Sequence, residues 1–206
     1  MTPQLNRLAY AALNLRFNPF GELSREQRVL LAVVDIGDLP QRLCQPRVAI
    51  QFLADHGYGK STHLLALHAQ FSQYTYTQVH TNVKPHFTAQ EIQFVDSIEN
   101  LSRLQRARLY RLSPRIAFTT HRDLSQELTT AGYSVYTRTL NQQSVDRVQA
   151  IFNRRIAHAR RFHDEPVPTV TAATVSRLIE RFDGNIRAME YELYEMFQDL
   201  KAVADV

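Results

Sequence analysis

The sequence predicts an α/β fold: a five-stranded parallel sheet flanked by helices and followed by an all-helical C-terminal segment. Three observations support this prediction. Five short apolar segments alternate with helical patterns between residues 48 and 140, which is typical of parallel sheets built from strand–helix–strand units. A glycine-containing loop joins the first of these segments to a helix. From residue 144 onward the pattern is helical throughout.

Each strand is expected where apolar, β-branched and aromatic residues form a short run. The expected strands are 48–53, 74–80, 92–96, 115–120 and 133–140. The helices expected between them are 61–71, 99–111 and 124–130. Three C-terminal helices are expected at 144–162, 171–182 and 185–202, with Gly184 separating the last two.

Two helical patterns precede the first strand, at 4–15 and 25–35. The second of them follows Ser24 and Gln27, whose spacing fits a capping box. A linker bracketed by prolines, 40–46, then leads to the first strand. The residues that precede the sheet are therefore expected to form short linker helices.

The composition excludes several classes of protein. The chain of 206 residues has 24 basic and 20 acidic residues, a net charge of +4, and Cys44 as its one cysteine, which rules out an internal disulfide and a thiolate metal cluster. Its longest apolar run, 29–34, is far shorter than the roughly 18 residues that cross a bilayer. Residues 1–15 mix polar with apolar side chains, unlike a secretory signal. A cytoplasmic protein without a membrane span is expected.

The loop between the first strand and its helix has the features of a phosphate-binding loop. Its residues Gly59, Lys60 and Ser61 form the end of a Walker A motif, although Ala54 replaces the first glycine. Backbone N–H groups at Gly57 and Gly59, and the N-terminal end of the helix, would face phosphate oxygens. Lys60 would reach the outer phosphates, and the Ser61 hydroxyl would ligate Mg²⁺. The residues expected to bind ATP or ADP are Asp55, His56, Gly57, Tyr58, Gly59, Lys60, Ser61 and Thr62.

A second carboxylate for the magnesium site is expected at Asp96, which ends the apolar run 92–96. With the phosphate loop, this pattern resembles the AAA+ ATPase superfamily, and more loosely the accessory ATPases of secretion, replication-initiation and transposition systems. The resemblance extends from Phe17 to about Leu200. It implies a P-loop NTPase sheet, with residues 1–142 forming linker helices plus the nucleotide-binding core and 143–206 forming a helical lid.

The resemblance also implies roles for individual residues. Asp96 is similar to the Walker B aspartate that supports Mg²⁺, and the next position, which in the family carries the glutamate that polarises water, is Ser97 here. Hydrolysis is therefore expected to be slow. A polar sensor at the end of the fourth strand would be Thr119 or Thr120, and Thr120 joins Lys60 and Asp96 as the expected catalytic set.

Two further nucleotide contacts are implied outside the sheet. Arg187 resembles the second-sensor arginine of the lid, but it could instead pair with Asp183 or Glu190. The segment that ends at Phe20 resembles a linker that packs against adenine, but Phe20 could equally staple the first two helices together. Both alternatives stay open at the level of sequence.

The predicted function is a nucleotide-dependent switch or accessory ATPase that binds ATP or ADP with Mg²⁺ and acts with a protein partner or by self-assembly. A small P-loop kinase for a nucleoside or metabolite is an alternative, but the chain has little room for the arginine-bearing lid insertion of such a kinase. A nucleic-acid-binding module is a second alternative, because the helix 144–162 is rich in arginine. The same arginines would also suit a lid helix that faces the acidic residues 190–195.

Overall fold

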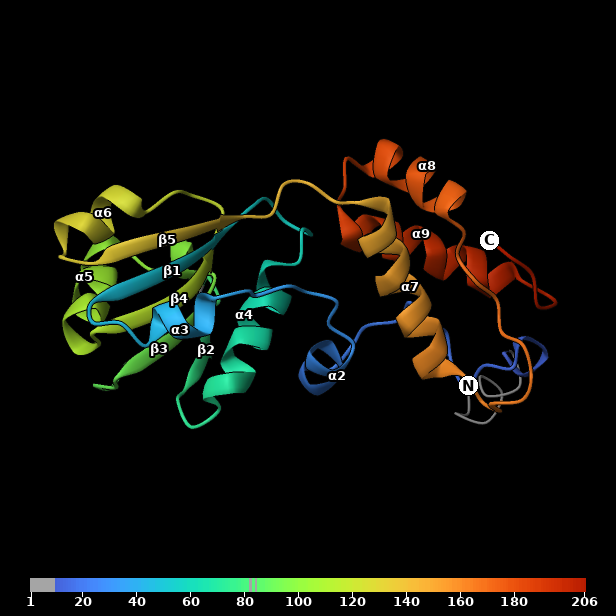
Figure 1. Ribbon diagram of the computed structural model, residues 1–206, viewed down its shortest axis with the longest axis horizontal. Helices are drawn as coiled ribbons and strands as arrows, with labels where there is room; N and C mark the ends of the chain where they lie inside the picture. The colour runs from blue at the N-terminus through green and yellow to red at the C-terminus, as the bar shows by residue number, and fades with distance from the viewer. Residues whose placement is uncertain (1–9, 82, 84) are drawn as a thin grey trace. The chain divides into compact units, whose positions relative to one another are not determined.

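The computed structural model describes residues 10–81, 83 and 85–206, and its contacts divide the chain into two compact units (Figure 1). The α/β unit spans Val34–Asn141. The helical unit combines the segment up to Val33 with Gln142–Val206. Part of the helix expected at 4–15 lies outside the described residues; the remainder contains the short 3-10 helix η1 (Ala11–Leu13).

The α/β unit contains a five-stranded sheet in which all strands are parallel, so the predicted fold class is confirmed. The spatial order is β2-β3-β4-β1-β5. The strands are β1 (Val48–Leu53), β2 (Tyr76–Gln78), β3 (Ile92–Asp96), β4 (Arg115–Thr120) and β5 (Ser134–Thr139). Strand β1 therefore lies between β4 and β5, and its loop leaves the sheet next to the end of β4.

Helices cover both faces of this sheet. The cluster on one face joins side chains of β1, β3 and β4 to α3 (Leu39–Leu43) and α4 (Lys60–His68). The cluster on the other face joins the alternate strand positions to α5 (Arg103–Leu112) and α6 (Ser125–Thr130). Burial on both faces explains why the strands read as nearly continuous apolar runs.

Local sequence signals account for most helix ends, and several elements differ from those expected. The helix expected at 99–111 is divided into η3 (Ile98–Asn100) and α5, because Ser102 and Gln105 form a capping box that starts α5 anew. The helix expected at 61–71 is α4 followed by the 3-10 turn η2 (Ala69–Phe71). Helix α3 occupies part of the expected proline-bracketed linker, since proline is compatible with a first helical turn.

The helical unit is built on three long helices, close to the positions expected. They are α7 (Val145–Ala159), α8 (Ala172–Phe182) and α9 (Ile186–Asp199), and a shorter helix, α2 (Arg25–Leu30), begins at the predicted Ser24 capping box. Asp183 and Gly184 both have positive φ, 50° and 76°, in the turn between α8 and α9. Glycine adopts this conformation without strain, which explains why the chain breaks there.

The N-terminal segment packs in the helical unit, whereas the sequence had grouped it with the sheet. Leu13, Leu15 and Phe20 are buried in one cluster with Phe152 of α7 and Phe197 of α9. The backbone of the segment also contacts α7, because the Arg16 N–H donates to the Ala159 carbonyl at 2.8 Å. These apolar side chains cover the inward faces of α7 and α9, which would otherwise be exposed to water.

Across residues 10–81, 83 and 85–206, no helix combines the length and the apolar character needed to cross a bilayer.

Candidate nucleotide-binding site

The predicted phosphate loop leaves the end of β1 and leads directly into α4. Gly57 and Gly59 have φ of 89° and 83°, and Gly59 is the N-cap of α4. A side chain at either position would be strained, so the two glycines are required by the backbone conformation itself. The His63 ring, 2% exposed, lies with Nδ1 2.9 Å from the Gly59 carbonyl and holds the loop to the first turn of the helix.

The loop side chains differ in exposure. Asp55 and His56 are exposed, Thr62 is half-buried, and Tyr58 is buried beneath the loop. Lys60 donates from Nζ to the carbonyls of Ala54 and Asp55, both at 2.7 Å. The ammonium group is therefore held within the curve of the loop, where phosphate oxygens bind in loops of this kind.

The structure brings Ser61 and Asp96 together. The Ser61 hydroxyl donates to Asp96 Oδ1 at 3.0 Å, although the two residues are 35 positions apart in the sequence. Asp96 is 4% exposed and receives two further hydroxyl donors, Thr119 at 2.5 Å on Oδ1 and Tyr76 at 2.9 Å on Oδ2. Tyr76 was not predicted, because nothing local in the edge strand β2 marks it as a neighbour of Asp96.

The donor set fits Mg²⁺. Hard cations prefer oxygen ligands, and Mg²⁺ in nucleotide sites is commonly held by one or two protein groups together with phosphate oxygens and water. Ser61 and Asp96 supply a hydroxyl and a carboxylate at the mouth of the phosphate loop. Among the described residues no cluster of three or more acidic, histidine or cysteine side chains is arranged to hold a metal by itself.

Of the two threonines proposed as a polar sensor, the structure places Thr119, not Thr120, beside Asp96. Thr120, the expected candidate, turns away from Asp96: its hydroxyl donates to the Arg122 carbonyl at 2.8 Å and accepts the Arg122 N–H at 3.0 Å. Thr119 contacts Asp96 instead, and it also accepts the Ser97 N–H at 2.7 Å. Side chains alternate along a strand, and the pairing of Val95 with Phe118 sets Thr119 beside Asp96.

Phe20 is not available to adenine in this structure. Its ring is 5% exposed and lies 5.7 Å from the Phe152 ring and 5.0 Å from the Phe197 ring, with both pairs edge to face. The Phe20 backbone N–H donates to Asn18 Oδ1 at 3.0 Å in a local turn. Phe17, by contrast, is 39% exposed.

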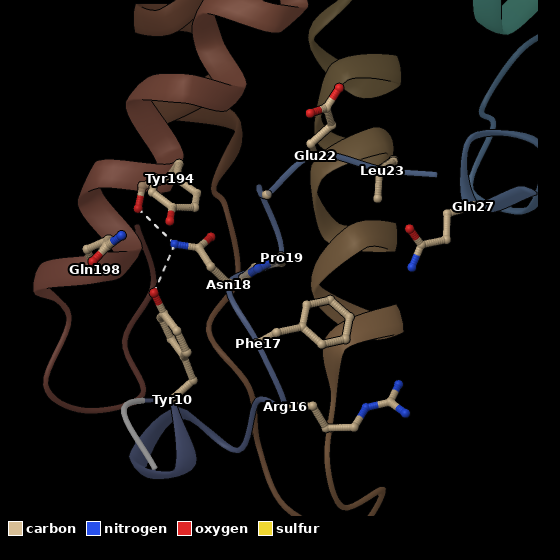
Figure 2. A pocket seen from close by; sticks show the side chains of 11 residues that line it. Tyr10, Arg16, Phe17, Asn18, Pro19, Glu22, Leu23, Gln27, Tyr194 and Gln198 are labelled. Atoms are coloured by element: carbon tan, nitrogen blue, oxygen red, sulfur yellow. Dashed lines mark hydrogen bonds between the residues drawn. The ribbon is translucent and has the colours of Figure 1, made fainter. Parts of the chain in front are cut away.

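The segment that precedes Phe20 lines an open cavity of about 480 Å³ within the helical unit. Figure 2 shows the Asn18 amide at its centre, where it donates to the Tyr194 carbonyl at 3.0 Å and to the Tyr10 hydroxyl at 3.3 Å. Phe17 and Gln198 also line the cavity. It therefore presents one exposed aromatic ring beside amide groups.

Arg187 lies in the first turn of α9 and is exposed. Within the described part of the chain it forms no ion pair, and Glu190, one of the two partners considered for it, pairs with Arg155. The expected turn before it is present, since Asn185 caps α9 through the Ala188 N–H at 3.1 Å. A cation at this end of a helix is unfavourable unless an anion binds nearby.

The arginines of α7 make contacts inside their own unit. Arg154 donates to the carbonyls of Leu30 and Ala32, at the C-terminal end of α2, and Arg147 donates to the carbonyl of Val33. Arg155 binds the carbonyls of Pro19 and Gly21 in addition to Glu190. These contacts tie the N-terminal segment to α7, and the one between Arg155 and Glu190 reaches the acidic residues 190–195.

Comparison with known proteins identifies the fold. The sequence matches no protein-family model and no curated protein. Solved structures with a similar fold include NtrX from Brucella abortus, with a TM-score of 0.53 and 12% identity over 84% of this chain. NtrX in complex with ADP gives a TM-score of 0.55 and 13% identity over 84% of this chain. Cdc6p from Pyrobaculum aerophilum gives 0.52 and 11% over 91%.

These similarities show that the chain has an AAA+ P-loop ATPase-like fold. The chain spans about half the length of the two NtrX chains, 52% and 53%, and 65% of the Cdc6p chain. At 11–13% identity the likeness concerns the fold alone.

Proposed function

We propose that the protein binds ATP or ADP with Mg²⁺ at the loop 54–62 and acts as a nucleotide-dependent switch or accessory ATPase with slow hydrolysis. The observation that carries this proposal is the 3.0 Å contact between Ser61 and Asp96, which joins the phosphate loop to the end of β3. The ADP bound to NtrX, a protein of similar fold, supports the choice of nucleotide.

Each group has a role in this proposal. The loop N–H groups and the N-terminal end of α4 bind the phosphates, and Lys60 exchanges its two carbonyl partners for phosphate oxygens. Ser61 ligates Mg²⁺, and Asp96 orients the ion or its water shell. The bound ion neutralises charge on the phosphate oxygens. Thr119, held by Asp96, replaces Thr120 as the proposed polar sensor.

The helical unit supplies the proposed switch. Arg187 is a candidate phosphate contact, because it is an exposed cation that its own unit leaves without an ion pair among the described residues. If the helical unit has a nucleotide-bound and a nucleotide-free conformation, the nucleotide can shift the equilibrium between them only by the difference in its affinity for the two conformations.

The direct test is the affinity for ADP and ATP, measured by titration calorimetry with Mg²⁺. Lys60→Ala should weaken binding about 10- to 100-fold, because a hydrogen bond to a charged group contributes about 1.5–3 kcal/mol. Lys201→Ala, the same change at an exposed residue outside the site, should bind as the wild type does. Equal affinities for the two variants would refute the assignment of the loop.

A second titration isolates the magnesium ligand. Ser61→Ala should bind ADP like the wild type in EDTA but should gain less affinity when Mg²⁺ is added, because only the metal-dependent part of the binding uses the hydroxyl. Ser72→Ala, at an exposed position, is the matched control. A full magnesium effect in Ser61→Ala would remove this residue from the metal site.

A further inference from the structure

Ser97 stands in a strained backbone conformation directly after Asp96. Its φ is 64° and its ψ is 53°, which is the left-handed region, rarely adopted by a residue with a side chain. The left-handed residue turns the chain back at the end of β3 and starts the short helix η3, which carries Glu99. Strained conformations of this kind are often kept where they place a functional group.

The carboxylate of Glu99 is buried but only half satisfied. Its side chain is 6% exposed, and Oε1 lies 2.8 Å from Nδ1 of His121. The second oxygen, Oε2, is buried and has no hydrogen-bond partner among the described residues. A buried carboxylate oxygen without a donor is costly, so its presence calls for a water molecule, an ion or a catalytic role.

The partner of Glu99 connects it to the phosphate loop. His121 follows the last residue of β4, and its ring centroid lies 5.6 Å from that of His56, which belongs to the phosphate loop. Strands β3, β4 and β1 are neighbours in the sheet. Glu99, His121 and His56 therefore follow three adjacent strands at the same edge, where the phosphates are proposed to bind.

We propose that Glu99, positioned by His121, is the carboxylate that polarises the water attacking the γ-phosphate of ATP, in place of the residue at position 97. This inference rests on the proposed nucleotide site, and it departs from the slow hydrolysis proposed there, which follows only from the serine at position 97. The water oxygen bonds to the γ-phosphorus while the bond from that phosphorus to the β–γ bridging oxygen breaks. ADP leaves with the electron pair, and the water proton passes to Oε2 of Glu99.

The neighbouring carboxylate is less suited to this role. Both oxygens of Asp96 accept hydroxyl donors, and the proposed function assigns this group to Mg²⁺. Glu99 is the acidic side chain at this edge that keeps a buried oxygen without a donor among the described residues. Glu99 lies two positions after Ser97 in the sequence. The left-handed turn at Ser97 reverses the chain, so that Glu99 still lies at the same edge of the sheet.

The test separates binding from hydrolysis. ATP affinity is measured by calorimetry, and phosphate release is measured under single-turnover conditions with Mg²⁺, with Lys60→Ala as the background. Glu99→Gln should keep ATP affinity within about threefold and lose about 10²–10⁴-fold in rate, the usual contribution of a positioned base. Glu91→Gln, the same change at the other end of β3, should hydrolyse ATP as the wild type does.

Two variants of His121 test its positioning role. His121→Ala should lower the rate about tenfold with unchanged affinity, and His121→Asn should restore most of it, because an amide can replace the Nδ1 donor. A purely structural histidine would change thermal stability in both variants and leave the rate per folded molecule unchanged. That result would exclude the positioning role.

Each remaining outcome is decisive. A wild-type rate in Glu99→Gln overturns the inference, as does a wild-type protein that binds ATP but releases no more phosphate than Lys60→Ala; the nucleotide site stands in both cases. Failure of the wild type to bind nucleotide overturns the proposed function as well. If Glu99→Gln does not fold, Glu99→Asp keeps the charge on a shorter side chain, and a wild-type rate in that folded variant overturns the inference.

Discussion

Each unit of the protein holds a buried charged side chain, Asp96 in the α/β unit and Arg155 in the helical unit, and the two have different kinds of partner. In the α/β unit, the side chains of Ser61, Tyr76 and Thr119 all donate to Asp96 at one edge of the sheet. In the helical unit, Arg155 donates to backbone carbonyls of the N-terminal segment, and Arg154, which is exposed, does the same.

This difference follows from architecture. The carboxyl ends of parallel strands meet at one edge, so residues far apart in the sequence converge there without a special connection. Three helices have no such edge, and a segment without regular structure needs donors for its own carbonyls. Arginine, with five donors in a planar group, supplies several of them at once. The arginines of α7 are therefore explained by the backbone carbonyls of the N-terminal segment that they bind.

The largest expected effect is on the apolar contact that holds the N-terminal segment. Phe20→Ala should lower the free energy of unfolding by about 3–5 kcal/mol, because it leaves a cavity between Phe152 and Phe197. Chemical denaturation followed by circular dichroism measures the loss. Phe17→Ala is the control, and its exposed ring should cost less than about 1 kcal/mol. Equal losses would contradict the orientation of the two rings.

The next effect separates the two arginines of α7. Arg155, 4% exposed, binds Glu190 and two carbonyls, so Arg155→Ala should cost about 2–3 kcal/mol. Arg154 is exposed, and Arg154→Ala should cost less than about 1 kcal/mol. Denaturation midpoints compare the two variants. A strong loss of affinity for polyanions in Arg155→Ala, with unchanged stability, would reverse this interpretation.

A smaller effect, dependent on pH, is expected in the α/β unit. The paired guanidinium of Arg106 holds the pKa of Glu127 below its ordinary value of 4.5, and the Tyr110 hydroxyl adds a further hydrogen bond at 2.9 Å. Burial, with Glu127 nearby, raises the pKa of Tyr110, which stays protonated and donates. Glu127→Gln should cost about 1–2 kcal/mol at neutral pH, since charge-assisted bonds are lost.

The sign of the pH dependence follows from this lowered pKa. The unfolded chain binds the proton of Glu127 more readily than the folded one, so the contribution to stability is present above about pH 4.5 and is lost as the pH falls through the folded pKa. The difference in melting temperature between the wild type and Glu127→Gln should therefore shrink from about pH 6 to about pH 3. A constant difference would show that packing, not charge, is responsible.

The smallest expected effect on affinity concerns Arg187. Arg187→Ala should weaken ATP binding about threefold, as expected for one exposed charge contact, and should abolish the protection from hydrogen exchange that ATP induces in residues 171–200. Arg187→Lys should restore only part of the protection, because lysine lacks the planar pair of donors. If hydrogen exchange in residues 171–200 of the wild type is the same with and without ATP, the helical unit does not respond to the nucleotide, and the proposed switch is contradicted.

The sequence by itself determined the local elements of this protein. Strands 92–96 and 115–120 have the predicted bounds, and the Ser24 capping box and the turn at Gly184 lie where expected. These features depend on residues within one or two turns of each other, so caps, glycines and alternation are enough to specify them. The loop 54–62 could be predicted for the same reason, because its glycines, Lys60 and Ser61 are close together in the sequence.

Only the tertiary structure decided which distant residues meet. The register of β3 on β4 brings Thr119 rather than Thr120 to Asp96. Phe20 lies in the helical core because its ring packs against Phe152 and Phe197, which are far away in the sequence. Each of these outcomes depends on a face or a register set by chain far away in sequence, and a one-residue shift in a strand reverses which side chain points to the site.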